Sequence, residues 1–497
     1  MTTTQSPTRS QLLTAWAREL TWADVPERTR AAARSQVVSN LAAVRASLRL
    51  PVGRALVAAY GAPTQEDPTR AAQVLAALAT AIDFDEVAYS GHISAGAVNV
   101  AIAEARHGGL DGETLLTAAV AANECAARIS AATILSPFFR GQTNTHTHLA
   151  SAVVARLHAR RAPAEQWTSA LGLALGIVPV PLHHGVVTSD LKALSASGPV
   201  RLALDACDAA AAGLTGSESI IEAPEGLLAQ LSVVPLPEAV TLGLGRRWHT
   251  DTLTYKRFPG SAYLHAAFDC AERLHRTHGP LDASRVQKIV VHASLLTWQL
   301  ERKVAPFLAG PGTPAAAATL SVGYGVACLL LKGSFGPDDL APAALADEAR
   351  WDLAAKVIVA HDWDVSVRMA QATSPLGEAL RQAGDRALKL PELLAWAGDD
   401  AAAVLAALGP PQESFAEATM AIGARLELEL AGGSAATESC AAPIGSAGPD
   451  TRRDHRAIVR AKFLATGGSA GVLDDLERLD RLDPDRTRRL ITAAVTG

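Results

Sequence analysis

The chain has 497 residues, a mass of 51.6 kDa, a formal net charge of −5 and a pI near 6.3. Hydrophobic residues make up 49% and charged residues 19%, which excludes a disordered chain. This length predicts two or three domains rather than one compact core. The near-neutral charge, without a basic block, argues against nucleic acid or an anionic membrane as the main partner.

The cysteines, the N-terminal segment and the apolar runs indicate in which cellular compartment the protein is expected. The five cysteines are odd in number and far apart, and none forms a Cys-x-x-Cys pair, which argues against a disulfide framework or a zinc knuckle. The N-terminal segment lacks the basic-then-apolar order of a signal peptide. The longest apolar runs are shorter than the roughly 20 residues that a membrane span needs. We therefore expect a soluble, cytoplasmic protein.

The first half of the chain is predicted to be helical. From Trp22 to about residue 250, apolar residues recur at helical spacing, and much of the apolar fraction is alanine, the best helix former. The clearest helical patterns lie at 28–48, 111–129, 150–161 and 197–214.

The pattern changes after Trp248. Short β-branched or alternating runs at 286–296, 356–360 and 424–430 predict strands, and helical patterns lie between them at 262–275, 320–331 and 378–408. A Gly/Ser/Ala/Pro-rich connection, 431–449, leads into C-terminal helices that we expect to return to the first domain. The fold class is therefore mainly α: a large all-helical domain built from both chain ends (1–250 and 447–497) and a smaller α+β domain (251–446).

No nucleotide-binding fingerprint or nucleophile elbow is present, so candidate chemistry rests on polar stretches. Asp83, His92 and Ser94 precede a predicted helix, and a histidine at a helix N-terminus lies where backbone N–H groups favour an anion. The alternative is a capped helix with a solvated histidine.

Two lysines stand out. Lys192 lies in an apolar, small-residue region, where an ammonium group can donate a proton or bind a carboxylate; the alternative is an ordinary surface lysine. Lys256 and Arg257 precede a proline where the helical pattern ends, and His265 follows. Domain junctions are favoured places for ligand clefts.

His146 and His148 are spaced by two, so both could bind a metal ion. No third ligand is visible nearby, and we expect no metal site.

Together these stretches resemble the MmgE/PrpD family, which includes 2-methylcitrate dehydratase, cis-aconitate decarboxylase and iminodisuccinate epimerase. The resemblance spans nearly the whole chain and is carried by Trp22-Ala-Asp-Val-Pro-Glu, Asp83-Phe-Asp, His92-Ile-Ser94 (His-Pro-Ser in the family), Asn123-Glu124 with Arg128, Lys192, Lys256-Arg-Phe-Pro259 with His265, Gly323-Tyr324 and Ala461-Lys462-Phe463-Leu464. The Lys256 motif is the most specific, since the chain has only eight lysines among 45 basic residues.

The resemblance implies that the α+β domain is a lid and that the site lies between the domains. The catalytic candidates are then Asp83, His92, Lys192, Lys256 and Tyr324, and the candidates for substrate binding are Arg257, Ser261, His265, His146, His148 and Ser94. It also implies a homodimer, a small-molecule acid as substrate, and no metal or organic cofactor.

The chemistry of such a site follows from charge. Removing a proton beside a carboxylate, or losing CO2, builds negative charge that fixed cations stabilise. Lys192 and Lys256 would supply these cations and His92 would move the proton. Asp83 would fix the histidine tautomer or act as the base, and Tyr324 would donate a hydrogen bond to the substrate.

The sequence departs from the family pattern in four places. Val87 stands where a hydroxyl residue is expected, Phe139-Arg140-Gly141 where a histidine is expected, and Ser261 where a histidine is frequent. The lid carries extra helical sequence at 366–417. These losses of polar contacts predict a bulkier, less charged acid than citrate.

Three functions remain open. The first is a cofactor-independent lyase, a dehydratase or decarboxylase. The second is an isomerase, epimerase or cyclase on the same scaffold, and the third is a helical dimer that has lost its chemistry.

Overall fold

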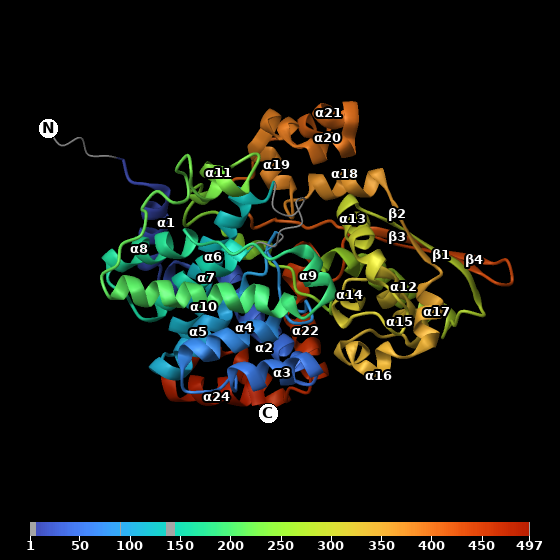
Figure 1. Ribbon diagram of the computed structural model, residues 1–497, viewed down its shortest axis with the longest axis horizontal. Helices are drawn as coiled ribbons and strands as arrows, with labels where there is room; N and C mark the ends of the chain where they lie inside the picture. The colour runs from blue at the N-terminus through green and yellow to red at the C-terminus, as the bar shows by residue number, and fades with distance from the viewer. Residues whose placement is uncertain (1–5, 90, 136–144, 497) are drawn as a thin grey trace.

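The structure is a computed structural model that describes residues 6–89, 91–135 and 145–496. It is mainly α, with a small α+β part, as the sequence predicts. Figure 1 shows the helices of the N-terminal half gathered on one side and the sheet with its own helices on the other. Within the described ranges, no helix combines the length and apolar character needed to cross a membrane.

The N-terminal half is built from helices that pack tightly on one another. They are α1 (Arg9–Glu19), α2 (Glu27–Leu48), α3 (Pro51–Tyr60), α4 (Pro68–Thr80), α5 (Ser94–Gly108), α6 (Gly112–Thr133), α7 (Thr145–Ala159), α8 (Ala164–Leu175), α9 (His183–Thr188), α10 (Leu191–Ala211) and α11 (Leu227–Leu231).

Small side chains let the central helices α4–α7 and α10 approach closely. Nearly every residue of α6 is buried, many of them alanines. A Cβ on Gly96 of α5 would lie 2.1 Å from the Ser151 hydroxyl of α7, so only glycine fits there. The alanine-rich composition thus becomes a dense helical core that fixes the ends of α5 and α10, where the candidate residues lie.

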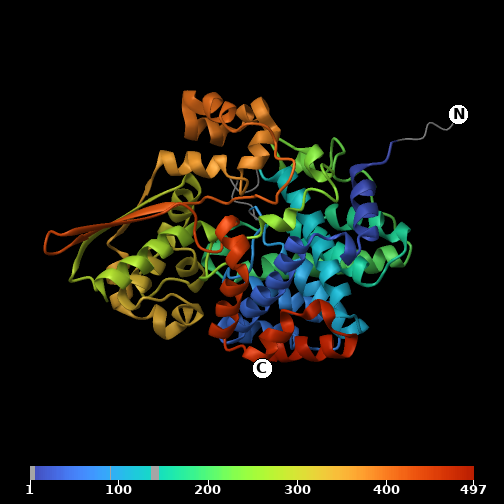
Figure 2. The ribbon, with the colours of Figure 1, turned by 180° about the vertical axis from the view of Figure 1, so that it is seen from behind.

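The C-terminal helices return to this core, as expected. They are α22 (Pro449–Ala465), α23 (Ala470–Leu476) and α24 (Pro484–Thr496). Helix α22 packs on α2, and α24 packs on α5. Figure 2 shows these red helices beside the blue N-terminal ones. The division of the chain at residues 250 and 446 stays a prediction.

The second part contains a four-stranded sheet in the order β2-β1-β3-β4. Strand β1 (Val286–Ala293) pairs in parallel with β2 (Val357–His361) and antiparallel with β3 (Ala424–Leu430), which pairs antiparallel with β4 (Ala435–Cys440). Helix α12 (His265–His278) packs on β3 and β4, and α15 (Val322–Lys332) packs on β2. Between β1 and β2 the chain also forms α13 (Leu295–Val304), α14 (Ala315–Thr319), α16 (Pro342–Leu345) and α17 (Glu348–Ala354).

Two expectations about this part were wrong. The 378–408 pattern is not one helix, because Gly384 and Gly398 adopt positive φ of 53° and 52° and end successive helices. The segment instead contains α19 (Gly377–Ala383), α20 (Pro391–Ala397) and α21 (Ala401–Ala406), after α18 (Trp363–Gln371). The connection 431–449 contains strand β4, because a turn with Gly433 at φ 81° reverses the chain after β3.

Candidate active site

The loop between α4 and α5 carries two of the candidate side chains, Asp83 and His92, and is held in an unusual backbone conformation. Asp83 has φ 54°, a left-handed conformation that is uncommon for residues other than glycine. The N–H of Gly260 donates to the carbonyl of Asp83 over 3.1 Å, and Val87 and Thr254 exchange backbone hydrogen bonds. These bonds lay the loop against the segment that carries Lys256.

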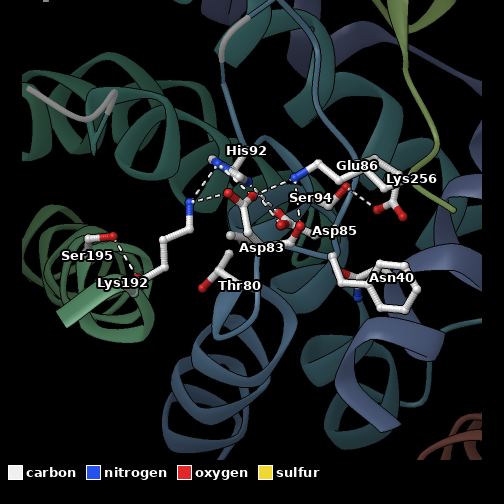
Figure 3. Close-up of polar contacts among 12 residues, drawn as sticks. Asn40, Thr80, Asp83, Asp85, Glu86, His92, Ser94, Lys192, Ser195 and Lys256 are labelled. Carbon is white, nitrogen blue, oxygen red and sulfur yellow. Dashed lines mark hydrogen bonds and ion pairs between the residues drawn. The ribbon is translucent and has the colours of Figure 1, made fainter. Parts of the chain in front are cut away.

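Asp83 lies among three cationic or basic side chains, as Figure 3 shows. Lys256 Nζ donates to Asp83 Oδ1 over 2.5 Å and to the Asp83 carbonyl over 2.9 Å. Lys192 Nζ lies 3.3 Å from Asp83 Oδ2, and His92 Nε2 lies 3.5 Å from Asp83 Oδ1. The two lysines, 64 positions apart in the sequence (256 − 192), therefore converge on one carboxylate.

His92 is held at both ring nitrogens. Its Nδ1 lies 3.0 and 3.1 Å from the two carboxylate oxygens of Asp85, and Lys192 Nζ lies 3.1 Å from its Nε2. Since an ionised carboxylate only accepts hydrogen bonds, Asp85 holds the proton on Nδ1. The lone pair of neutral His92 then lies on Nε2, between Lys192 and Asp83.

Burial and charge set the ionisation of the two carboxylates. Burial alone would raise the pKa of Asp83, but Lys192, Lys256 and His92 together lower it well below its ordinary value. Burial likewise opposes ionisation of Asp85, and His92 overcomes this effect and lowers the pKa of Asp85. Both groups are therefore carboxylates at neutral pH.

Exposure shows from which side a ligand reaches the cluster. The Lys256 and Asp85 side chains are fully buried, whereas the side chains of Lys192 and His92 keep 16% and 21% of their surface exposed. A bound molecule therefore meets His92 and Lys192 first.

Asp83, Asp85 and His92 offer ligand atoms within 4.8 Å of one another, which is a spacing that metal sites use. The lysine ammonium groups at 2.5 and 3.3 Å from Asp83 already supply positive charge there and repel a second cation. The donor set therefore fits an organic anion better than a metal ion.

The two histidines of α7 have different surroundings. The Nε2 of His146 hydrogen-bonds the Thr133 hydroxyl at 2.8 Å, and burial lowers the pKa of His146 to about 4. Burial lowers the pKa of His148 to about 3, with a contribution from His92. Among the described residues, the buried Nδ1 of His148 has no hydrogen-bond partner. Within the described part of the chain, His148 is thus the one of the two whose charge interacts with His92 and whose Nδ1 lacks a partner.

Two further candidates come from the Lys256 segment. Burial lowers the pKa of His265 to about 3, with a contribution from Lys256, and its ring stacks on Phe268. The hydroxyl of Ser261 accepts from the N–H of Tyr263 and caps a short 3-10 helix. His265 therefore lies near the cluster, and Ser261 has a local structural bond.

The remaining candidates are engaged elsewhere. Arg257 forms ion pairs with Asp269 and Glu272 at 2.7 and 2.9 Å. The hydroxyl of Tyr324 donates to the carbonyl of Asp339 over 2.7 Å, so the structure does not bring Tyr324 to the cluster. Ser94 does not cap α5: it is the first residue of that helix, and its hydroxyl donates to a buried carboxylate, that of Glu86. The expected loop histidine position, Phe139-Arg140-Gly141, lies outside the described residues.

Sequence reasoning missed Asp85 and Lys462 as site residues. Asp85 could have been considered as the second aspartate of the Asp83-Phe-Asp motif, but only the fold shows that it contacts His92. Lys462 belongs to the C-terminal motif and donates to the Phe84 carbonyl, inside the site loop.

A mainly helical fold with two lysines and a histidine around a buried aspartate defines a protein suited to anionic substrates and proton transfer. The MmgE/PrpD N-terminal domain matches residues 11–238, and the MmgE/PrpD C-terminal domain matches residues 258–386. The chain therefore belongs to the MmgE/PrpD family. Members of this family are generally enzymes, and its domains point to dehydratase-type, lyase-like function on small organic acids. Among curated proteins, no match to this chain was found.

Proposed function

We propose that this protein is a cofactor-independent lyase that dehydrates or decarboxylates a small organic acid. The single observation that carries the proposal is the convergence of Lys192, Lys256 and His92 on Asp83. Such a cluster provides both a base and the positive charge that stabilises a carbanion or enediolate.

The base in this proposal is Nε2 of His92. Asp85 holds the proton on Nδ1, so the Nε2 lone pair, which faces Lys192 in the free protein, takes a proton from the carbon beside the substrate carboxylate once Lys192 binds that carboxylate. The C–H electron pair moves into the enediolate of that carboxylate. Lys192, which is partly exposed next to His92, binds the developing charge, and Lys256 keeps Asp83 in place.

The second half of the reaction depends on the substrate. In a dehydration, the enediolate electrons form the C=C bond as hydroxide leaves the neighbouring carbon, and the protonated His92 returns its proton to give water. In a decarboxylation no proton is removed first. His92 starts as the imidazolium, the C–C bond breaks so that CO2 leaves and the electron pair stays on the carbon, and that carbon then takes the Nε2 proton, which leaves His92 neutral. Both routes use the same charges and need no cofactor.

The substrate that we propose is bulkier and less charged than citrate. Val87 contributes only its backbone to the loop pairing, and the Ser261 hydroxyl caps its own helix, so neither supplies a polar contact that the family pattern expects. We further propose a homodimer that works in the cytoplasm.

The test is incubation of the protein with hydroxy and unsaturated acids in D2O, followed by NMR. We expect either loss of water, or loss of CO2 with deuterium added at the carbon that carried it, and a decrease in turnover of about 10³-fold or more in His92→Ala and Lys256→Ala. Lys288→Ala, at an exposed position on β1, is the control and should keep full activity. Unchanged turnover in the two site variants would contradict the proposal. Deuterium at a stereocentre without loss of either group would identify an isomerase or epimerase instead.

A further inference from the structure

A further buried lysine, Lys462, packs against the site loop, which is the segment between α4 and α5 (residues 81–93). Lys462, in helix α22, donates to the carbonyl of Phe84 over 2.5 Å and to the hydroxyl of Ser39 on α2 over 2.8 Å. Its Nζ lies 4.0 Å from the centre of the Phe84 ring and 3.6 Å from the Glu86 carboxylate. The Lys462 side chain is only 2% exposed, so no substrate reaches it.

Lys462 contacts the two residues that flank Asp85 in the sequence. Phe84 precedes Asp85 and Glu86 follows it, and Lys462 contacts both. The loop needs such support, because the left-handed conformation of Asp83 is unfavourable for a residue other than glycine and persists only where surrounding bonds hold it.

The support continues into the helical core through buried hydrogen bonds. The Ser94 hydroxyl donates to Glu86 over 2.9 Å and accepts from Gln36 on α2, which also bonds Asn123 on α6. The loop is therefore fixed to α2, α5, α6 and α22 by fully buried groups, and Lys462 is the cation among them.

We infer that Lys462 is a positioning residue: by holding Phe84 and Glu86 it fixes Asp85, and through Asp85 it sets the tautomer and orientation of His92. The expected effect of Lys462 on turnover rests on the proposed function. The expected effect of Lys462 on the tautomer of His92 does not, because it is measured in the protein without substrate.

Electrostatics agrees with this role. Burial lowers the pKa of Lys462 to about 8, while Glu86 and Asp85 act in the opposite direction. Burial raises the pKa of Glu86, and Lys462 opposes that change. The charged pair is therefore mutually dependent, and removing one member leaves the other buried without its main counter-charge.

The first measurement is the pair of ¹⁵N chemical shifts of His92 in the free protein, assigned by comparison with His92→Gln. We expect a proton on Nδ1 in the wild type and a mixture of both tautomers in Lys462→Met. Glu86→Gln, which keeps the shape of the side chain, should change the shifts in the same direction. This variant provides the test if Lys462→Met does not fold.

Arg45→Met is the matched control. Arg45 is also a buried cation that joins α2 to the C-terminal segment, through the carbonyls of Thr466, Gly467 and Ala494, but it does not contact the site loop. Its loss should destabilise the fold and leave the His92 shifts unchanged.

The second measurement is turnover of a substrate found by the D2O test. Lys462→Met should lower kcat by about 10–100-fold through misplacement of His92, with KM changed by less than about threefold because Lys192 and Lys256 remain. Unchanged His92 shifts in both Lys462→Met and Glu86→Gln would overturn the inference, as would equal shift changes in Arg45→Met. An inactive wild type whose His92 shifts respond as expected would instead refute only the proposed function.

Discussion

Single residues at this site act in pairs whose roles are fixed by geometry. Asp83 and Asp85 are two positions apart, yet Asp83 is bound by two lysines and Asp85 by the imidazole of His92. The carboxylate that binds Nδ1 selects the tautomer of a histidine, whereas a carboxylate bound by lysines maintains the positions of those cations. We therefore assign the tautomer-fixing role to Asp85 within the proposed function.

This assignment predicts the result of Asp85→Asn. An amide can present its NH2 group to Nδ1 and so favour the wrong tautomer, with no basic lone pair at Nε2. We expect kcat to fall by about 10²–10⁴-fold while KM changes little, as for other histidine–carboxylate pairs. Steady-state kinetics tests this, with Asp269→Asn, a buried aspartate paired to Arg257 outside the cluster, as control. An equal loss in both variants would argue for a structural effect only.

The sequence allowed some of these residues to be predicted and not others. Lys192 and Lys256 were found because lysines are rare in the chain and each lies in a distinctive setting. Asp85 was missed because the folded shape of its loop decides that it faces His92, 7 positions away, and Lys462 was missed because it contacts Phe84 across 378 positions of the chain. Spacing in a sequence does not reveal which of two neighbouring aspartates faces a histidine.

At the scale of elements, a buried ion pair joins the segment that contains α18–α21 to the N-terminal half of the chain. Glu378 on α19 pairs with Arg247, and the guanidinium of Arg247 lies 4.2 Å from the centre of the Phe415 ring. Both side chains are nearly inaccessible, at 2% for Arg247 and 1% for Glu378. The segment is thus held by an ion pair at α19 and by an aromatic contact after α21.

Breaking this pair should loosen the anchored segment. Glu378→Met leaves Arg247 buried and unpaired, so we expect a loss of about 3–5 kcal/mol in the free energy of unfolding. The double variant Arg247→Met/Glu378→Met should lose less than the two single variants added together, because it leaves no unpaired charge. Denaturant unfolding of the four proteins measures this coupling. Strict additivity would show that the pair contributes nothing as a pair.

Helices and strands differed in how well their sequence patterns predicted them. Long periodic segments such as α2 and α6 were predicted within a few residues, because an amphipathic or alanine-rich pattern of that length has few alternatives. The 378–408 segment was not, because two glycines with positive φ interrupt a continuous helical pattern. Strand β4 was missed because its pairing depends on β3, and its own residues have weak strand preference.

At the scale of the whole molecule, the two chain ends and the middle segment must assemble before the site exists. The cluster draws Asp83, Asp85 and His92 from one loop, Lys192 from α10 and Lys256 from the segment after it, with Lys462 from α22. Local pattern could predict which helices form, but not that α22 crosses α2 to place a lysine behind the loop. That arrangement depends on core packing among segments more than 400 positions apart.

The same dense core predicts how global stability depends on pH. Histidines that are buried without charge have lowered pKa values, about 4 for His146 and about 3 for His148 and His265. In the unfolded chain these groups titrate near pH 6.5. Between pH 6.5 and about 4 the unfolded state therefore binds more protons than the folded state, so stability decreases as the pH falls through this window.

His265→Leu isolates one of these groups. The ring lies between Phe258 and Phe268, and within the described ranges its buried Nε2 has no hydrogen-bond partner, so an apolar side chain suits the position. We expect the decrease in unfolding free energy between pH 7 and pH 4 to shrink by a few kcal/mol at most, about 1.4 kcal/mol for each pH unit of the window. Urea unfolding at several pH values measures the slope. An unchanged slope in His265→Leu would mean that the pKa of His265 is not lowered in the folded protein.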